Sequence, residues 1–407
     1  MGALKVLTFG WEMAPVMNGG LGVVCRDLTY ALASKGVDMT FVVPKLPHKF
    51  KFDSFNLVNA AEYDLSEDEI KNITISTLMT PYISGTFFNY SPKGKKFDQD
   101  KDLYGFNLML EVQRYGLIAS KIAKSVEADL IHAHDWMTAF AAIEAKKVLR
   151  KPLIFHVHST EYDRSAFNPH PTILEYETQA LNFADKTIAV SQYTKNILVD
   201  KYGIDPNKIA VVHNAVNNEP KDVVSQGYRS SKEKIVLFLA RMSIQKGADY
   251  LLKAAQKVVS KKRNVKFVFV GNGPMLNKLV EMAFDLGIKD NVVFAGALSH
   301  DEVDKAYRHA DLFVMPSVTE PFGITPLEAM KNGTPVLISK QSGVSEVIKN
   351  CLKVDFWDID AMASKILSIL YNDTLSESLS QNGYHDVAQL TWSSQADKVL
   401  EVYQSLL

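Results

Sequence analysis

Short apolar runs alternate along the chain with longer segments in which apolar residues recur every three or four positions. The short runs are rich in Val, Ile and Phe, which favour buried strands, and the longer segments have the spacing of amphipathic helices. Strands that alternate with helices in this way are typical of a mostly parallel sheet with helices on both faces. We therefore predict an α/β fold with two doubly wound parallel sheets, one in each half of the chain.

The predicted strands form two groups separated by a polar segment. In the first half they are Lys5–Gly10, Met39–Val43, Asp129–His132, Leu153–Val157, Lys186–Val190 and Ile209–Val212. In the second half they are Ile235–Ala240, Val265–Val270, Asn291–Ala295, Asp311–Met315 and Pro335–Ile338. The polar segment, residues 217–232, breaks the alternation and is typical of a linker. We predict a first domain over residues 1–220, a second over 221–391, and a final helix over 392–407 whose apolar face must pack against another part of the protein.

Residues 56–105 form a second irregular stretch, with a predicted hairpin around Ile73–Met79. Its basic loop Ser91–Lys96 is more simply explained as a solvated loop than as a phosphate site. The triplet Asp98-Gln99-Asp100 lies in the same stretch, and a similar triplet, Asp358-Ile359-Asp360, precedes a helical pattern whose start an Asp would cap. We predict no metal site at either triplet.

Composition narrows the function classes. The 407 residues carry 45 Lys and Arg against 46 Asp and Glu, a formal charge of -1, so there is no overall positive field that would collect nucleic acid or anionic lipid. The only two cysteines, Cys25 and Cys351, are too few for a disulfide framework or a thiolate metal cage and fit a reducing compartment. No signal peptide or run of membrane-spanning length is apparent. We expect a cytoplasmic protein without a membrane span or a nucleic-acid partner.

In open α/β sheets, ligands bind beyond the carboxyl ends of the strands, so the residues that follow each strand are the informative ones. The first strand is followed by a loop that ends in Gly19-Gly20-Leu21-Gly22, and a helix is predicted from near Val23. Glycines at a helix start expose backbone N–H groups that favour an anion and let a sugar approach the main chain. A plain turn explains these glycines equally well.

Two histidine pairs end neighbouring strands of the first half: His132 with His134, and His156 with His158. Residues spaced by two on a strand point to the same face, so each pair could bind a metal. In the alternative that we favour, His132 and His156 are buried within their strands, and only His134, Asp135 and His158 reach the cleft. No carboxylate or cysteine at metal-ligand spacing completes a metal site.

The strand ends of the second half carry charges and glycines. Arg241 and Lys246 follow one buried strand, where two cations could clamp a diphosphate, although both could also be ordinary surface residues. Asn272 follows the next strand between Gly271 and Gly273, an arrangement that lets a flat base or a ribose approach the main chain.

Two carboxylates stand eight positions apart near a third strand end. Glu320 lies in a loop rich in Pro and Gly, and Glu328 lies one turn into a helix that begins near Thr325-Pro326. This spacing lets both point into one cleft. If Glu328 merely complements the helix dipole, Glu320 is left unexplained.

Eight motifs in this order resemble a known family. They are GGLG at Gly19–Gly22, HAHDW at His132–Trp136, HVHSTEYDRS at His156–Ser165, AVSQYTK at Ala189–Lys195, HNAV at His213–Val216, ARMSIQKG at Ala240–Gly247, GNGP at Gly271–Pro274 and EPFGITPLE at Glu320–Glu328. The chain resembles the retaining, nucleotide-sugar-dependent glycosyltransferases of the GT-B architecture, and in particular the glycogen and starch synthase-like group. The resemblance covers nearly the whole chain. It implies two Rossmann-like domains that face a central cleft, with the final helix crossing back to the first domain.

The resemblance implies a catalytic set of four residues. Arg241 and Lys246 would bind the donor diphosphate, Glu320 would face the transferred sugar, and His158 would lie across the cleft near the sugar hydroxyls. No cofactor and no metal would be needed. The implied partners are a nucleotide-sugar, with glucose carried by ADP or UDP, and a glycan acceptor such as an α-glucan.

The resemblance also implies a donor-binding set. Glu328 would bind the ribose, and the base would lie near Asn272 and Gly273. The other implied donor-binding residues are Gly20, Leu21, Asp135, Asn214, Gly323, Ile324 and Thr325.

Two positions depart from the family pattern. Met17 stands where bacterial glycogen synthases usually carry a Lys, and Ala166 stands where Gly is frequent. The first departure shifts the interpretation toward the broader family that includes sucrose-phosphate synthase-like enzymes. A sugar-nucleotide epimerase, a non-catalytic sugar-nucleotide-binding relative and a glycogen phosphorylase share the fold and are the remaining alternatives.

Overall fold

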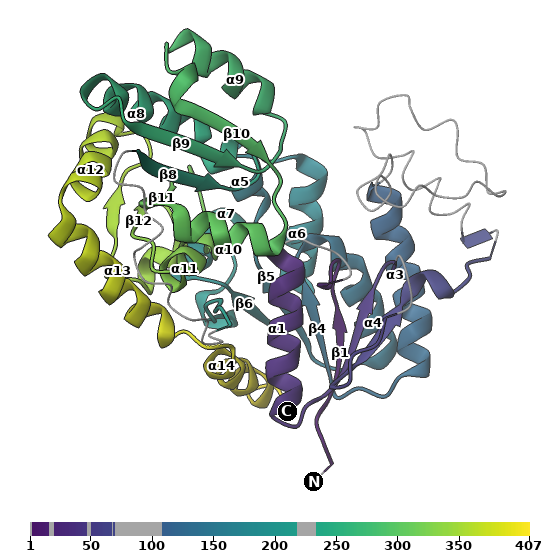
Figure 1. Cartoon of the computed structure of the whole chain (residues 1–407). Coiled ribbons are helices and arrows are strands. Elements are labelled where there is room, and N and C mark those ends of the chain that lie inside the picture. The colour runs from purple at the N-terminus through teal and green to yellow at the C-terminus, as the bar shows by residue number, and fades with distance from the viewer. Residues whose placement is uncertain (1, 16–19, 47–49, 67, 70–107, 218–232) are drawn as a thin grey trace.

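The computed structural model describes residues 2–15, 20–46, 50–66, 68–69, 108–217 and 233–407. These residues form two parallel β-sheets with helices packed against both, and the final helix lies beside the first one (Figure 1). The predicted fold class, two doubly wound parallel-sheet domains, is confirmed.

The first sheet has the strand order β3-β2-β1-β4-β5-β6-β7, with every pair parallel. Its strands are β1 Lys5–Phe9, β2 Asp38–Val43, β3 Asn56–Asn59, β4 Leu130–His134, β5 Leu153–Val157, β6 Lys186–Ala189 and β7 Ile209–Val211. Its helices are α1 Gly20–Ser34, α3 Leu108–Ser125, α4 Ala139–Leu149, α5 Glu161–Arg164, α6 Pro171–Phe183 and α7 Gln192–Tyr202.

The second sheet has the order β10-β9-β8-β11-β12-β13 and is also parallel throughout. Its strands are β8 Lys234–Leu239, β9 Val265–Val270, β10 Val292–Gly296, β11 Leu312–Met315, β12 Val336–Ser339 and β13 Leu352–Val354. Its helices are α8 Ala248–Lys261, α9 Leu276–Asp285, α10 His300–His309, α11 Thr325–Lys331, α12 Ile359–Tyr371 and α13 Asp373–Ala388, and α14 Trp392–Gln404 ends the chain.

All eleven predicted strands are present, and two further strands, β3 and β13, were not predicted. Both lie at sheet edges and are only partly buried, so they lack the continuous apolar run that marks a central strand. β3 therefore corrects the expectation that residues 56–105 are irregular from their start. The predicted hairpin at 73–79, the basic loop at 91–96, the triplet at 98–100, Met17 and residues 218–232 of the linker lie outside the described residues.

The second Asp triplet behaves as a helix start. Asp358 caps α12, because its Oδ1 accepts a hydrogen bond of 2.9 Å from the N–H of Ala361. Asp360 forms an ion pair with Lys257. These roles explain both carboxylates without a metal ion.

The last helix returns to the first domain. On α14, Trp392, Ala396, Val399 and Tyr403 are buried in one cluster with apolar residues of α1, β1 and β4. The hydroxyl of Tyr403 also lies 2.7 Å from His132 Nδ1. The apolar face read from the sequence is therefore buried against the first domain, and burial of such a face is the main source of a helix's stability in a protein.

Candidate active site

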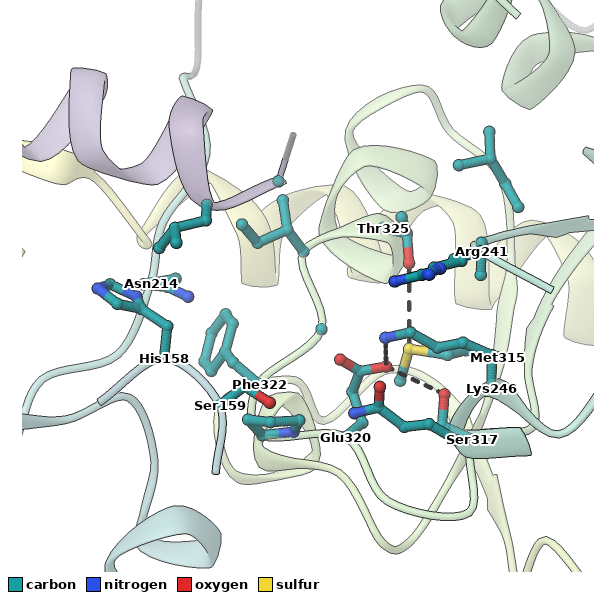
Figure 2. A pocket seen from close by; sticks show the side chains of 18 of the residues that line it. His158, Ser159, Asn214, Arg241, Lys246, Met315, Ser317, Glu320, Phe322 and Thr325 are labelled. Carbon is teal, nitrogen blue, oxygen red and sulfur yellow. Dashed lines mark hydrogen bonds and ion pairs between the residues drawn. The ribbon is translucent and has the colours of Figure 1, made fainter. Parts of the chain in front are cut away.

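A cavity of about 500 Å³ lies between the two domains (Figure 2). The first domain contributes the start of α1 and the loops that follow β4, β5 and β7, and the second contributes the loops after β8 and β11. Of the residues singled out from the sequence, those that line it are Gly20, Leu21, Asp135, His158, Asn214, Arg241, Lys246, Glu320, Gly323, Ile324 and Thr325. Asn272, Gly273 and Glu328 are not part of this lining.

Glu320 and Lys246 form an ion pair inside the cavity. Lys246 Nζ lies 2.7 Å from Glu320 Oε2, and the hydroxyl of Ser317 donates to the same oxygen at 3.0 Å (Figure 2). Glu320 is only 8% exposed, so the pair and the hydroxyl stabilise a carboxylate that burial would otherwise disfavour.

A glycine makes this pairing possible. Gly247, directly after Lys246, has a φ of 65°, and a Cβ on it would collide with the carbonyl oxygen of Pro316. Only a residue without a side chain lets the turn at the end of β8 approach the loop after β11 so closely. The main chains are tied there as well, because the N–H of Val318 donates to the carbonyl of Gln245 at 2.8 Å.

Arg241 differs from Lys246. It is exposed and lines the cavity, and the described part of the chain gives it no ion-pair or hydrogen-bond partner. An anionic group in the cavity would meet an uncompensated guanidinium at Arg241, but would have to share Lys246 with Glu320. The sequence predicted that Arg241 and Lys246 both bind the diphosphate, whereas among the described residues Lys246 has a carboxylate partner and Arg241 has none.

Asp135 is held in an unusual backbone conformation. Its φ is 60°, and its Oδ1 accepts the N–H groups of His158 at 2.7 Å and Ser159 at 3.3 Å. Burial raises the pKa of Asp135 to about 7, against the opposing effects of Arg164 and these two N–H groups. Its carboxyl group therefore fixes the loop that carries His158.

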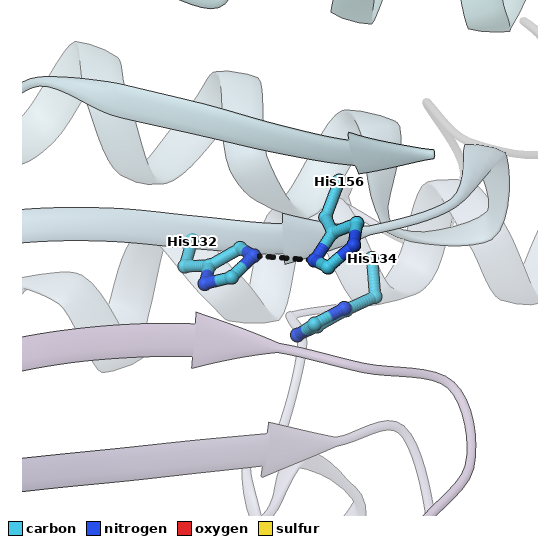
Figure 3. Close-up of side chains that lie close together, drawn as sticks. All are labelled: His132, His134 and His156. Atoms are coloured by element: carbon cyan, nitrogen blue, oxygen red, sulfur yellow. Dashed lines mark hydrogen bonds between the residues drawn. The ribbon is translucent and has the colours of Figure 1, made fainter. Parts of the chain in front are cut away.

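Behind Asp135 and the loop that carries His158 lies a stack of buried histidines (Figure 3). His132 Nε2 lies 3.2 Å from His156 Nδ1, and His134 Nδ1 lies 2.9 Å from His158 Nε2. Burial lowers the pKa of all four, that of His158 to about 3, so the imidazoles are neutral at physiological pH. The expectation that His134 reaches the cleft is wrong: it is 2% exposed and lies behind His158.

His132, His134 and His156 each have a nitrogen within 4.8 Å of the others, so a metal ion is the alternative explanation of the stack. The rings of His132 and His134 are nearly parallel, with an interplanar angle of 26° and centroids 4.4 Å apart. The lone pair of an imidazole nitrogen lies in the ring plane, so stacked rings direct their lone pairs side by side rather than at one point. We therefore interpret the cluster as a hydrogen-bonded stack that supports His158.

The three predicted residues outside the cavity lining have structural partners. The hydroxyl of Tyr307 donates to Glu328 Oε2 at 2.9 Å. The main chain of Asn272 accepts the N–H of Met242 at 2.9 Å, and a Cβ on Gly273 would collide with the carbonyl of Met242. Close packing of two loops thus accounts for that glycine without a ligand, and nucleotide contacts by all three remain predictions.

Sequence reasoning missed a group of buried residues around Glu320. Asp163, Ser191, Thr194 and Thr319 are fully buried and meet where the two domains touch. Asp163 and Thr319 are separated by 156 positions, so no local spacing could have paired them. The one available signal was that Asp163 and Ser191 lie in motifs that follow strands.

Comparisons with known proteins agree with this architecture. Residues 221–386 match the family described as glycosyl transferases group 1, and residues 103–219 match glycosyltransferase family 4. An uncharacterized glycosyltransferase of Methanocaldococcus jannaschii is 29% identical over 98% of both chains, and a glycogen synthase of Mycobacterium tuberculosis is 22% identical over 98% of this chain and 94% of its own. The solved structure of a sucrose-phosphate synthase from Thermosynechococcus elongatus superimposes with a TM-score of 0.76 over 99% of both chains, at 20% identity.

Two facing parallel-sheet domains and the structural match define the GT-B architecture. Within that architecture, residues 221–386 are similar to the glycosyl transferases group 1 family. None of the described helices is both long and apolar enough to cross a membrane.

Proposed function

We propose that the protein is a retaining glycosyltransferase that moves a hexose, with glucose as the first candidate, from an ADP- or UDP-sugar to an α-glucan or another glycan acceptor. The arrangement of Glu320 carries the proposal. Its carboxylate lies in the cavity beside Lys246 and near Arg241 (Figure 2), and His158 and Asn214 of the first domain line the same cavity. A sugar diphosphate in this cavity would have cations at its phosphates and a carboxylate at its sugar.

In the transfer, the bond between the anomeric carbon and the diphosphate oxygen breaks, and negative charge develops on the leaving group. Arg241 and Lys246 stabilise that charge. Positive charge develops on the sugar, and Glu320 stabilises it. Glu320 is bound to Lys246 and Ser317, and Asp135 to two N–H groups, so both carboxylates are made weaker nucleophiles by the hydrogen bonds that they accept.

These contacts favour a front-face route. The acceptor oxygen bonds to the anomeric carbon on the face that the diphosphate leaves, and its proton passes to a diphosphate oxygen. His158 does not act as an acid, because burial lowers its pKa to about 3; its role is to contact sugar hydroxyls as a neutral imidazole. A covalent sugar–enzyme intermediate is the competing route, and trapping one on Glu320 or Asp135 would replace this mechanism.

We also propose that the transfer needs no divalent metal, because cationic side chains occupy the place of a metal at the diphosphate. Full activity in EDTA is the expected result. Complete loss of activity in EDTA, restored by Mg²⁺ or Mn²⁺, would contradict it.

The acceptor has two candidate classes. The glycogen synthase of M. tuberculosis supports a glucan, and the likeness to sucrose-phosphate synthase keeps a small sugar acceptor as the second candidate. The test is to incubate the protein with ADP-, UDP- and GDP-sugars, each with glycogen, maltooligosaccharides or a small sugar phosphate, and to determine the products by mass spectrometry and the anomeric configuration by NMR.

An α-linked product from an α-linked donor supports retention. A free nucleotide-sugar converted to its epimer without an acceptor would indicate the epimerase alternative. Tight donor binding without any product would indicate a non-catalytic relative.

A further inference from the structure

The loop that carries Glu320 is held from both domains. Thr319, just before Glu320, donates its hydroxyl to Asp163 Oδ1 of the first domain at 2.5 Å. Pro321, just after it, accepts a hydrogen bond at its carbonyl from Ser191 of the first domain, also at 2.5 Å. The proposed sugar-facing residue is therefore bracketed by two contacts that cross between the domains.

Asp163 is itself rigidly placed. Its Oδ2 accepts the main-chain N–H of Thr160 at 2.9 Å and the hydroxyl of Thr160 at 2.7 Å. The N–H of Asp163 in turn donates to Thr160 Oγ1 at 3.3 Å, and the two N–H bonds form a capping box on α5. This leaves Oδ1 for Thr319. The hydroxyl of Tyr193 donates to Thr319 Oγ1 at 2.9 Å, which completes a chain of hydrogen bonds from Tyr193 through Thr319 to Asp163.

The carboxylate of Glu320 depends on where this loop lies. Its main chain pairs with the loop after β12: the N–H of Glu320 donates to Gln341, and its carbonyl accepts the N–H of Gly343, each at 2.9 Å. Its side chain must reach Lys246 and Ser317 from that position. Productive catalytic geometry tolerates errors of only about 0.5 Å, so a small shift of Thr319 would move Glu320 out of place.

We propose that Asp163 is a positioning residue, which acts through the hydroxyl of Thr319 to hold Glu320 in its place in the cavity. This inference rests on the role proposed above for Glu320. It ties turnover to a first-domain carboxylate that does not line the cavity.

A separate contact keeps the domains joined, which allows a clean test. Glu346 of the second domain accepts the N–H groups of Gln192 and Tyr193 at 2.9 and 2.8 Å, and its Oε2 lies 2.9 Å from His213 Nε2. These bonds do not involve Thr319. Removal of the Thr319 hydroxyl should therefore disturb the loop without separating the domains.

The first test compares Thr319→Val, which keeps the shape but removes the hydroxyl, with Thr319→Ser, which keeps the hydroxyl. We expect kcat to fall about tenfold in Thr319→Val, with the donor KM changed less than about twofold, and to recover in Thr319→Ser. The matched control is Thr29→Val, which removes a buried hydroxyl that bonds to the carbonyl of Cys25 within α1. Equal kcat values for Thr319→Val and the wild type would overturn the proposal.

A double-mutant cycle separates positioning from a structural role of Asp163. If Asp163→Asn acts through Thr319, the kcat of the double variant Asp163→Asn/Thr319→Val should equal the kcat of the less active of the two single variants. Losses that multiply would mean that Asp163 acts on α5 alone and would overturn the proposal.

Hydrogen exchange tests the same contact without activity. In Thr319→Val, the amide of Glu320 should exchange faster than in the wild type and in Thr29→Val, and Thr319→Ser should restore the slow rate. Unchanged exchange would overturn the positioning role even if the enzyme is active. A wild type that turns over no donor would overturn the proposed function alone, because the exchange result stands by itself.

Discussion

The two walls of the cleft are both built from loops that follow parallel strands, but their side chains differ in charge. The first-domain wall presents His158 and Asp135 in front of a stack of neutral, buried imidazoles that hydrogen-bond to one another, and Asp135 accepts main-chain N–H groups. His156 Nε2 and His158 Nδ1 have no hydrogen-bond partner among the described residues. The second-domain wall presents Arg241 and the Lys246–Glu320 pair, which are charged and partly open to the cavity.

This difference follows from the cost of burying charge. A charge far from water must be paired or neutralised, so the deeply buried wall is made of neutral groups that hold geometry. The wall that must stabilise a diphosphate keeps its charges where a ligand can reach them. Substitutions of the charged residues in the second wall should therefore have the largest effect on turnover, and substitutions of the buried imidazoles behind the first wall should mainly affect stability at acid pH.

The largest effect is expected at Arg241. Arg241→Ala should lower kcat about a hundredfold or more, because it removes the one cation of the cavity that the described residues leave uncompensated. Steady-state kinetics measures this effect. Arg263→Ala, at an exposed position before β9 on the opposite edge of the sheet, is the matched control and should retain normal turnover. Near-native turnover of Arg241→Ala would show that the diphosphate lies elsewhere.

The second prediction concerns the ion pair. Lys246→Ala and Glu320→Gln should each lower kcat by about tenfold to a hundredfold, mainly without weakening donor binding, because both act on charge that develops in the transition state. Since the two side chains touch, the double variant should lose less than the product of the single losses. If the losses of the two single variants multiply in the double variant, the pair has no functional coupling. If Glu320→Gln only raises the donor KM, Glu320 is a ground-state ligand.

The buried histidines behind the first-domain wall should determine how the free energy of unfolding changes at acid pH. The pKa of His156 lies well below 6.5 in the folded protein, so between that value and pH 6.5 only the unfolded chain binds the proton, and stability falls as the pH falls. His156→Gln should make the slope of unfolding free energy against pH shallower by about 1.4 kcal/mol per pH unit, the equivalent of one proton. Urea unfolding between pH 5 and 7.5 measures it. The exposed His385→Gln is the control, and an equal slope in His156→Gln and the wild type would contradict a neutral stack.

The smallest effect is expected at Glu328. Glu328→Ala should raise the donor KM by about two- to tenfold with kcat nearly unchanged, the equivalent of one ribose hydrogen bond of ~0.5–1.5 kcal/mol. Tyr307→Phe, which removes the hydroxyl that donates to Glu328, should raise KM less. A loss of kcat in Glu328→Ala would contradict the division of roles between Glu328 and Glu320.

The candidate site was partly predictable, and the two glutamates show why. Glu320 stands in a loop where no helix start accounts for it, so its residue type and position singled it out. Its pairing with Lys246 could not be foreseen, because the partners end different strands and lie 74 positions apart. His134 was misplaced for a related reason: alternation along a strand assigns a face to a residue but does not say how far the cavity extends along that face.

The alternation of apolar runs and amphipathic segments by itself determined that the chain forms two parallel α/β sheets, because burial on one or two faces imposes a period on the local sequence. It also determined which strand ends carry charges and glycines. The tertiary structure alone decided which residues far apart in the sequence meet: Asp163 contacts Thr319 across 156 positions, and Tyr403 contacts His132 across 271. Contacts of this kind leave no period in the sequence, because they arise from the packing of one domain against the other and of the last helix against the first domain.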